Sequence, residues 1–414
     1  MAILEQQTSQ QLIELENEYG AHNYHPLPVV LSRGEGVHVW DVDGKQYYDF
    51  LSAYSAVNQG HCHPKIVNAM VQQAQTLTLT SRAFHNDMLG KYEKFACEFF
   101  GFDKLLPMNT GAEAVETALK LCRKWAYEVK GIDENKAEII VCENNFHGRT
   151  TTIISFSNDP VARKNFGPFT NGFIKIAYDN LEALEAALQN NPNIGGFLVE
   201  PIQGEAGVYV PSKGYLTKAK ALCEQYNVLF IADEVQTGIA RTGKLLAVNH
   251  ENVTPDILIL GKAISGGVYP VSAVLANDAI MDVIKPGNHG STFGGNPIAA
   301  AVAMAALEVV RDEKLAENAE TLGTIFRSEL NKYIETSNIA SLVRGKGLLN
   351  AILVNDEEDS DTAWNICLAL RDNGLLAKPT HGNIIRFAPP LVMNEEQLLD
   401  CVNIIIKTLM QFEK

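Results

Sequence analysis

The sequence has no long hydrophobic run and no excess of basic residues. Its longest uninterrupted apolar stretch, Ile298 to Leu307, is about half the length that a membrane-spanning helix needs, which is about 20 residues. The 34 Lys and Arg are outnumbered by 49 Asp and Glu, giving a net charge of −15. An acidic protein without a basic cluster has no general attraction for phosphate backbones or anionic lipids. We therefore expect neither nucleic acid nor a membrane as a partner.

Paired cysteines and targeting features are also missing. The seven cysteines form no CxxC pair, which is typical of reduced and mostly buried thiols. His61-Cys62-His63 groups three possible metal ligands, but no second cluster lies at a workable spacing, so we expect a turn here and no metal site. The first 20 residues contain no Lys or Arg and fit neither a secretory signal nor a transit peptide, which predicts a cytoplasmic protein.

Short apolar runs alternate with helical patterns through the middle of the chain. The runs lie at residues 139–142, 195–199, 228–232, 257–260 and 271–276. Near-continuous apolar strands between helices are typical of a mostly parallel sheet covered on both faces. The sequence therefore predicts an α/β fold with a large domain at 56–300, while an N-terminal segment at 1–55 joins the C-terminal part at 301–414 in a smaller domain.

Two charged residues follow predicted buried strands. Asp233 ends one apolar strand and Lys262 comes just after a later one, so both can reach the carboxyl edge of the sheet, where α/β folds place their ligands. A carboxylate there can hold a pyridinium nitrogen, and a desolvated lysine is tolerated when it forms a Schiff base with an aldehyde. Taken alone, Asp233 could equally be a helix cap or a metal ligand.

A phosphate-binding element precedes these residues. Thr110-Gly111-Ala112 stands at the predicted start of a helix, where free backbone N–H groups and the helix dipole favour an anion. Several motifs extend the pattern over essentially the whole chain: Asn109-Thr-Gly-Ala-Glu113, Phe146-His-Gly-Arg149, Glu200-Pro-Ile-Gln203, Asp233-Glu-Val-Gln236, Leu260-Gly-Lys262 and Ser291-Thr-Phe-Gly-Gly-Asn-Pro297. Through them the sequence resembles the class III pyridoxal-phosphate aminotransferases of fold type I.

The resemblance implies a cofactor, pyridoxal 5′-phosphate, and a set of contacts to it. Lys262 corresponds to the Schiff-base lysine and Asp233 to the partner of the ring nitrogen. Phe146 and Val235 correspond to the groups on the two ring faces, and Gln236 to a contact of the phenolic oxygen. The phosphate ligands would be the backbone of Gly111 and Ala112 and, from the neighbouring subunit, Thr292. A site shared in this way implies a homodimer.

Two segments carry a narrower resemblance within the class. Residues 21–28 and 51–64 are similar to those of ornithine aminotransferases. This similarity implies that Tyr24 and Tyr54 meet the α-amino and α-carboxylate end of ornithine, so that the distal amine faces the cofactor. Class members acting on acetylornithine or 4-aminobutyrate typically lack a tyrosine at position 54. Without the family context, either ring could be an amphipathic side chain at a domain seam.

Two arginines and a glutamate complete the implied substrate site. Arg149 would grip a distal carboxylate through its bidentate fork, and Arg386 would bind the α-carboxylate of glutamate or 2-oxoglutarate. Glu205 resembles the glutamate that masks this arginine while ornithine reacts. Either arginine could instead form a structural ion pair. His147 stands where some ornithine enzymes carry tryptophan, so we assign it no role.

The implied activity is a ping-pong transfer of the δ-amino group of ornithine to 2-oxoglutarate. The nearest alternatives are an acetylornithine or a 4-aminobutyrate aminotransferase of the same class. A catalytically silent binding protein on this fold is a further alternative, because fold does not dictate function. The joint presence of the cofactor and substrate residues named above argues against it.

Overall fold

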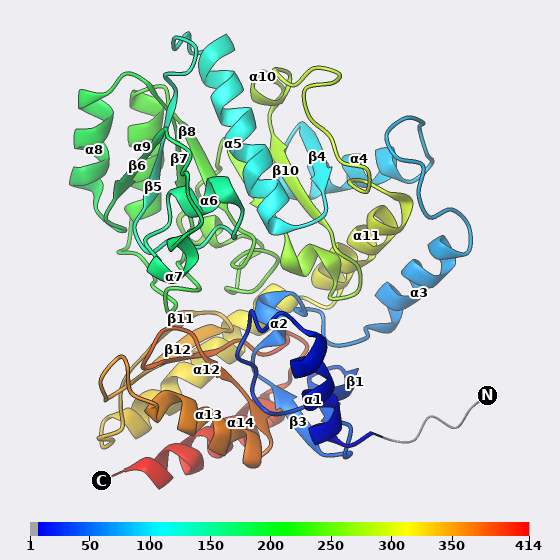
Figure 1. Ribbon diagram of the computed structural model, residues 1–414, viewed down its shortest axis with the longest axis vertical. Helices are drawn as coiled ribbons and strands as arrows, with labels where there is room; N and C mark the ends of the chain where they lie inside the picture. The colour runs from blue at the N-terminus through cyan, green and yellow to red at the C-terminus, as the bar shows by residue number, and fades with distance from the viewer. Residues whose placement is uncertain (1–6, 414) are drawn as a thin grey trace.

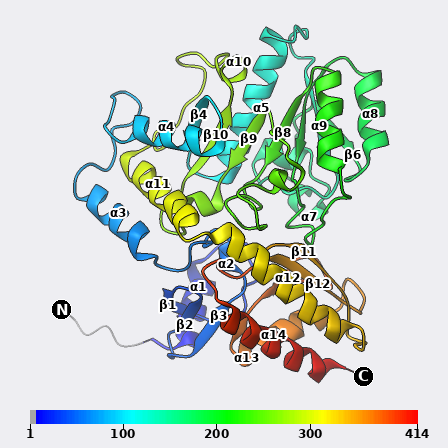
Figure 2. The same cartoon turned by 180° about the vertical axis from the view of Figure 1, so that it is seen from behind.

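The computed structural model describes residues 7–413. Within them the chain forms a large domain around a seven-stranded sheet and a smaller domain that combines N-terminal and C-terminal segments of the chain (Figure 1). The view from behind shows α11 (Pro297–Asp312) on the large domain and α12 (Leu315–Ile334) on the small one (Figure 2).

The sheet of the large domain is mostly parallel, which confirms the predicted α/β fold. Its strands are β4 (Lys104–Met108), β5 (Glu138–Cys142), β6 (Phe173–Ile176), β7 (Ile194–Val199), β8 (Leu229–Asp233), β9 (Ile257–Leu260) and β10 (Ser272–Ala276). They lie in the order β4-β10-β9-β8-β7-β5-β6. The run from β9 to β6 is parallel, while β10 is antiparallel to both of its neighbours.

Alternate residues of each strand enter two separate hydrophobic cores. In β5, Ile139 and Val141 pack in the core beside α5 (Gly111–Glu128), while Ile140 and Cys142 pack in the core on the opposite face. Because side chains alternate across a strand, a sheet that is covered on both faces needs apolar residues at every position. This need produces the short apolar runs seen in the sequence.

Helices cover both faces of this sheet (Figure 1). The remaining helical elements of the large domain are α3 (Pro64–Ala74), α4 (Leu89–Phe100), α6 (Thr151–Ser155), α7 (Pro160–Arg163), α8 (Leu181–Asn190), α9 (Tyr215–Gln225), α10 (Asp278–Met281) and the 3₁₀ turns η1 (Ala247–Glu251) and η2 (Lys262–Ser265). Helix α5 begins at Gly111 because Thr110 and Glu113 form a capping box. Helix α3 begins at Pro64, directly after the segment in which the sequence predicted a turn.

The smaller domain is built from both ends of the chain. Its strands are β1 (Leu31–Glu35), β2 (His38–Asp41), β3 (Gln46–Asp49), β11 (Ala340–Lys346), β12 (Leu349–Val354), β13 (Leu375–Leu376), β14 (Lys378–Pro379) and β15 (Ile384–Phe387), and its helices are α1 (Ser9–Tyr19), α12, α13 (Thr362–Asp372), α14 (Glu395–Leu409) and η3 (Met410–Phe412). Strand β3 pairs in parallel with β13, where Tyr48 lies opposite Leu375. The two termini are thereby joined in one sheet.

The division at residues 300 and 301 that the sequence suggested falls inside α11. This helix is continuous from Pro297 to Asp312 and packs on α3 and α4, whereas α12 packs on β11. The structural division therefore follows α11. A single apolar helix carries no composition change at that point. Among the described residues, no helix is long and apolar enough to cross a membrane.

Candidate active site

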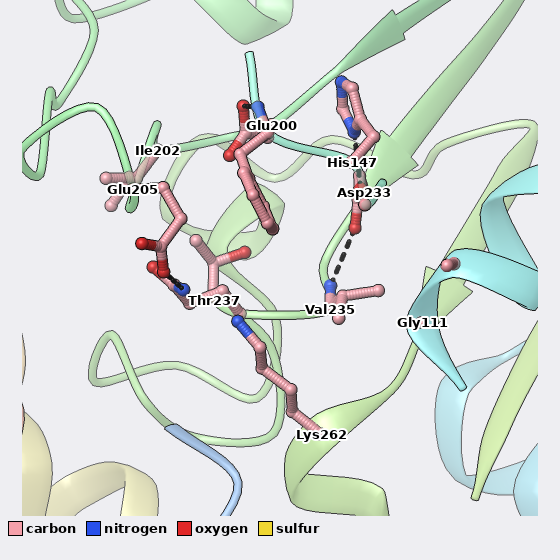
Figure 3. A pocket seen from close by; sticks show the side chains of 13 residues that line it. Gly111, His147, Glu200, Ile202, Glu205, Asp233, Val235, Thr237 and Lys262 are labelled. Atoms are coloured by element: carbon pink, nitrogen blue, oxygen red, sulfur yellow. Dashed lines mark hydrogen bonds and ion pairs between the residues drawn. The ribbon is translucent and has the colours of Figure 1, made fainter. Parts of the chain in front are cut away.

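A cavity of about 180 Å³ lies beside the carboxyl ends of β7 and β8. Its lining is Gly111, Ala112, Phe146, His147, Gly148, Glu200, Ile202, Glu205, Asp233, Val235, Gln236, Thr237 and Lys262. Figure 3 shows Lys262 reaching into this space, with Asp233 and His147 on one side and Glu205 on another. The fold thus brings together seven predicted cofactor residues and the predicted gate, Glu205, although they are spread over 152 positions of sequence, from 111 to 262.

Asp233 is the last residue of β8 and is held by two hydrogen bonds. Its Oδ1 atom accepts from the Val235 backbone N–H at 3.0 Å, and its Oδ2 atom lies 2.6 Å from Nδ1 of His147. Both side chains of the pair are buried. Burial alone would lower the pKa of His147, but the hydrogen bond and charge of Asp233 raise it. An imidazole that holds a buried carboxylate fixes the direction in which that carboxylate points.

Lys262 opens η2 immediately after Gly261 and has φ of 45°. Such a left-handed conformation is uncommon for a residue with a side chain and clusters at functional sites. Burial lowers the pKa of the Lys262 amine to about 8, although Glu205 opposes this shift. A lysine with a depressed pKa is more often uncharged near neutral pH and therefore nucleophilic.

The start of α5 forms one wall of the cavity through Gly111 and Ala112. A Cβ atom on Gly111 would lie 2.8 Å from Cγ1 of Val235, so this close approach of helix and loop requires glycine. The Glu113 N–H donates to Oγ1 of Thr110 at 3.2 Å, which leaves the Gly111 and Ala112 N–H groups at the helix start to bind an anion. Thr292, the predicted phosphate ligand, does not line this cavity and is exposed on the surface of its own chain.

Phe146 and Val235 both line the cavity, as the two ring-face residues would. Phe146 remains 39% exposed, so its ring is available to an occupant. Glu200 accepts a hydrogen bond from the Phe146 N–H at 3.1 Å. Burial raises the pKa of the Glu200 carboxyl to about 8. Glu200 therefore fixes the backbone that carries the aromatic wall.

Glu205 and Arg386 form the ion pair that the resemblance to the class III aminotransferases implied. Nη1 of Arg386 donates to Oε1 of Glu205 at 2.7 Å. Burial would raise the pKa of Glu205, but Arg386 and Lys262 together with hydrogen bonds from Gln236 and Arg386 lower it to about 2. Arg386 is only 2% exposed, and the ionised carboxylate of Glu205 neutralises its charge.

Gln236 is oriented differently from its predicted role. Its amide nitrogen donates to the same Glu205 oxygen at 2.7 Å, and its amide oxygen accepts from Arg386 at 3.3 Å. A Cβ atom on Gly204 would meet the Gln236 oxygen at 1.6 Å, so only glycine there leaves room for this arrangement. The expected contact of Gln236 with the phenolic oxygen of the cofactor stays a prediction. In this structure Gln236 hydrogen-bonds both members of the Glu205–Arg386 ion pair.

Tyr54 lies beside this pair, with its ring centroid 5.2 Å from the guanidinium carbon of Arg386. Tyr24 and Tyr54 line one cleft of about 460 Å³. Tyr54 sits in α2 (Ser52–Ser55), whose residues all have positive φ, from 47° to 71°. Each left-handed residue with a side chain costs roughly 1–2 kcal/mol, so surrounding contacts must hold this turn.

Arg149 lies in a wider cleft of about 580 Å³ that shares Phe146, His147 and Glu205 with the cavity. Residues 380–384 of the small domain line the cleft too. Arg149 is exposed and lies 5.7 Å from the centre of the Phe146 ring. Within residues 7–413 it forms no ion pair with a carboxylate, so its charge is free for a ligand.

The cavity fits pyridoxal 5′-phosphate on the chemistry of its walls. It presents an amine, a buried carboxylate, an aromatic face and free helix N–H groups within one space. The Nε2 atom of His147 is buried and has no hydrogen-bond partner among residues 7–413, which leaves a polar group for an occupant or a water molecule to satisfy. His61 and His63, considered above as metal ligands, bind two different carboxylates, those of Asp49 and Glu313.

The sequence missed His147 and Glu200 as site residues. Both stand inside motifs that were recognised, since His147 follows Phe146 and Glu200 follows an apolar strand. For Glu200, which directly follows β7, a polar residue at a buried strand end was the available signal, the same one that identified Asp233. His147 lies in the loop after β5 and carried no such signal.

The family model "Aminotransferase class-III" matches residues 19–409. The chain is 64% identical to "Ornithine aminotransferase, mitochondrial" of Drosophila melanogaster over 395 residues, covering 95% of this chain and 90% of that protein. The curated protein of the same name from Rattus norvegicus is 60% identical over 405 residues, covering 98% and 91%.

Two solved structures carry different names. A protein of Elizabethkingia anophelis described as an acetylornithine aminotransferase is 67% identical, with a TM-score of 0.91 over 98% of this chain and 100% of that one. The ornithine aminotransferase of Toxoplasma gondii, crystallised with partial occupancy of PLP, is 51% identical, with a TM-score of 0.96 over 99% and 95%.

Proposed function

Because the chain belongs to the class III aminotransferases, which use pyridoxal 5′-phosphate, we propose that it transfers the δ-amino group of L-ornithine to 2-oxoglutarate. The products are glutamate-5-semialdehyde, which cyclises to pyrroline-5-carboxylate, and glutamate. The observation that carries this proposal is the ion pair between Glu205 and Arg386 with the Tyr54 ring beside it. The ion pair keeps Arg386 from binding the α-carboxylate of ornithine, and the Tyr54 ring offers a different contact for that end of the substrate.

The bound cofactor supplies an electrophilic aldehyde carbon and a pyridinium ring that accepts electron density. Lys262 would hold the aldehyde carbon, and Asp233 would hold the proton on the ring nitrogen. Gly111 and Ala112 would bind the phosphate through backbone N–H groups, while Phe146 and Val235 would flank the ring. Each of these six residues lines the cavity.

Lys262 is the acid and base of the reaction. With its pKa lowered to about 8 by burial, about a tenth of the amine is unprotonated at pH 7, far more than for an ordinary lysine, and this form can take a proton from the δ-carbon of ornithine. Asp233 keeps its orientation during this transfer because His147 and the Val235 N–H hold both of its oxygens. The same cavity then serves 2-oxoglutarate, so the two half-reactions alternate.

Glu205 decides which end of a substrate enters first. While it pairs with Arg386, an α-carboxylate gains nothing at that arginine, and the δ-amine of ornithine is presented instead. Glutamate or 2-oxoglutarate would displace Glu205 from Arg386 and place its distal carboxylate on Arg149. Arg149 is unpaired among the described residues and exposed in the adjoining cleft.

A homodimer belongs to this proposal. Thr292 and Phe293 are exposed on the isolated chain, Phe293 to 50%. A second copy would cover this surface and receive Thr292 at the phosphate end of its own cavity. Sedimentation of the cofactor-loaded enzyme tests the dimer. The predicted cytoplasmic location stays a prediction.

Acetylornithine is the second candidate, and the name of the similar Elizabethkingia anophelis structure favours it. Acetylornithine carries an acetyl group on its α-nitrogen, so its α end lacks the ammonium that Tyr54 and Tyr24 would receive. The two tyrosines beside one cleft therefore support ornithine over acetylornithine.

The regiochemistry can be tested with ornithine carrying ¹⁵N only at the δ position. Incubation with 2-oxoglutarate should give ¹⁵N-glutamate, with pyrroline-5-carboxylate trapped as the other product. Unlabelled glutamate would show that the α-amine reacts and would refute the proposed orientation. Turnover of acetylornithine but not ornithine would establish the second candidate.

A further inference from the structure

Tyr54 depends on an unusual backbone for its position. Ser52, Ala53, Tyr54 and Ser55 have φ of 47°, 47°, 61° and 71°, and none of the four is glycine. Side-chain-bearing residues adopt this conformation singly and rarely in succession. A left-handed turn of this kind does not persist on its own local preferences, so neighbouring groups have to fix it.

Asp49 caps the turn from the end of β3. Its Oδ1 atom accepts hydrogen bonds from the N–H groups of Leu51 at 2.8 Å and Ser52 at 2.9 Å. Its other oxygen, Oδ2, lies 2.7 Å from Nε2 of His61. The Asp49 and His61 side chains are only 10% and 22% exposed, so water competes little for these hydrogen bonds.

His61 is itself fixed by the turn between β1 and β2. Its backbone exchanges hydrogen bonds with Gly36, at 2.8 Å and 3.0 Å. Its ring lies so close to Gly34 that a Cβ atom there would be 2.9 Å from the imidazole. The absence of a side chain at Gly34 leaves room for the ring, whose Nε2 faces Asp49. A continuous set of contacts runs from β1 through His61 and Asp49 to the turn that carries Tyr54.

We propose that His61 and Asp49 are positioning residues that hold the left-handed turn, and through it Tyr54, against the substrate site next to Arg386. The inference rests on the proposed function, because the role of Tyr54 in selecting ornithine does. His61 does not line the cofactor cavity. It lies at the wall of the cleft that Tyr24 and Tyr54 share, and it acts on the turn through Asp49. Its loss should impair reaction with ornithine, which uses Tyr54, more than reaction with glutamate, which uses Arg386 and Arg149.

The test compares His61→Ala, His61→Gln and a matched control, His63→Ala. His63 is also a histidine paired with a carboxylate, Glu313 at 2.9 Å, but that pair joins the start of α3 to α11. We expect His61→Ala to lower kcat/KM for ornithine about tenfold while the glutamate half-reaction changes little. Glutamine can still donate to Asp49 and should restore most of the loss, and the control should behave as wild type.

A double-mutant cycle isolates the route of the effect. If His61 acts through Tyr54, then His61→Ala should cost little more once Tyr54→Ala is present. Losses that multiply in the double variant would overturn the proposal. So would equal losses for ornithine and glutamate in His61→Ala.

Amide hydrogen exchange of the cofactor-loaded enzyme gives a readout that does not depend on any substrate. Exchange at Leu51 and Ser52 should accelerate in His61→Ala, and it should stay at the wild-type rate in His61→Gln and His63→Ala. An unchanged exchange rate in His61→Ala would refute the proposal that His61 holds the turn. A wild-type enzyme that ignores ornithine would refute the proposed function instead, while the exchange data would still decide this inference.

Discussion

Nη1 of Arg386 lies 2.7 Å from Oε1 of Glu205, so the guanidinium that we propose as the α-carboxylate receptor is already paired before any substrate arrives. Gln236 reinforces the closed state, since its amide donates to the same oxygen at 2.7 Å. Removing the carboxylate from a buried arginine would leave an uncompensated charge, but an incoming carboxylate can replace the one already there. On the proposed function, this arrangement would let one cavity accept two substrates in opposite orientations.

Removal of the Glu205 carboxylate should weaken this discrimination. In Glu205→Ala, Arg386 becomes free, so we expect α-amino substrates to react roughly tenfold faster in the first half-reaction relative to the δ-amine of ornithine. The ¹⁵N labelling of glutamate measures the ratio. Glu205→Gln keeps the shape without the charge and should show an intermediate effect. An unchanged ratio in both variants would count against the gate.

The depressed pKa of Lys262 predicts a stability change with pH in the cofactor-free protein. Burial lowers this pKa from 10.5 to about 8, so between these values the unfolded chain binds more protons than the folded one, and stability rises with pH. Below pH 8 the cost of the buried charge is fully present. Relative to Lys262→Met, the wild type should gain up to about 3 kcal/mol from pH 8 to 10.5, measured by urea unfolding. A constant difference would show that the amine is not desolvated.

His147 should matter for cofactor binding although the sequence gave it no role. His147→Ala leaves the buried Asp233 carboxylate with the Val235 N–H as its remaining partner among the contacts described. We expect pyridoxal phosphate affinity to fall about 10- to 100-fold. His147→Asn retains an N–H donor near the Nδ1 position and should lose less. Titration of the cofactor-free protein measures both, and equal affinities for all three proteins would contradict the role.

Tyr54 should set the choice between amines. Tyr54→Ile removes the ring beside Arg386, so kcat/KM for ornithine should fall by roughly tenfold or more relative to that for 4-aminobutyrate. Tyr54→Phe keeps the ring and tests the hydroxyl separately. If the ratio of kcat/KM values for the two amines does not move in Tyr54→Ile, then Tyr54 does not receive the α end of ornithine.

The parts of the site that were predictable are those fixed by local sequence. Asp233 ends an apolar strand and Gly111 follows a capping threonine, so strand polarity and helix capping place them without knowledge of the rest. Their proximity to Lys262 follows from the parallel order of β8 and β9. The fold class was predictable for the same reason, because continuous apolar strands require cover on both faces.

The features that were not predictable depend on contacts distant in sequence. His147 reaches Asp233 across 86 positions, through a loop whose course no local pattern determines. The Gln236 amide turns toward Glu205 because Gly204 leaves space for it. The left-handed turn at 52–55 contains no glycine to signal it. Its capping group, Asp49, lies three residues earlier in a strand.

The most direct measurement is a half-reaction. The purified enzyme loaded with pyridoxal phosphate is mixed separately with ornithine, acetylornithine and 4-aminobutyrate while the absorbance of the cofactor is followed. We predict fast conversion to the pyridoxamine form with ornithine alone, accompanied by pyrroline-5-carboxylate, and no conversion in Lys262→Ala. Conversion only by acetylornithine or 4-aminobutyrate would keep the fold and the role of Lys262 but contradict the assignment of Tyr24, Tyr54 and the ornithine reaction.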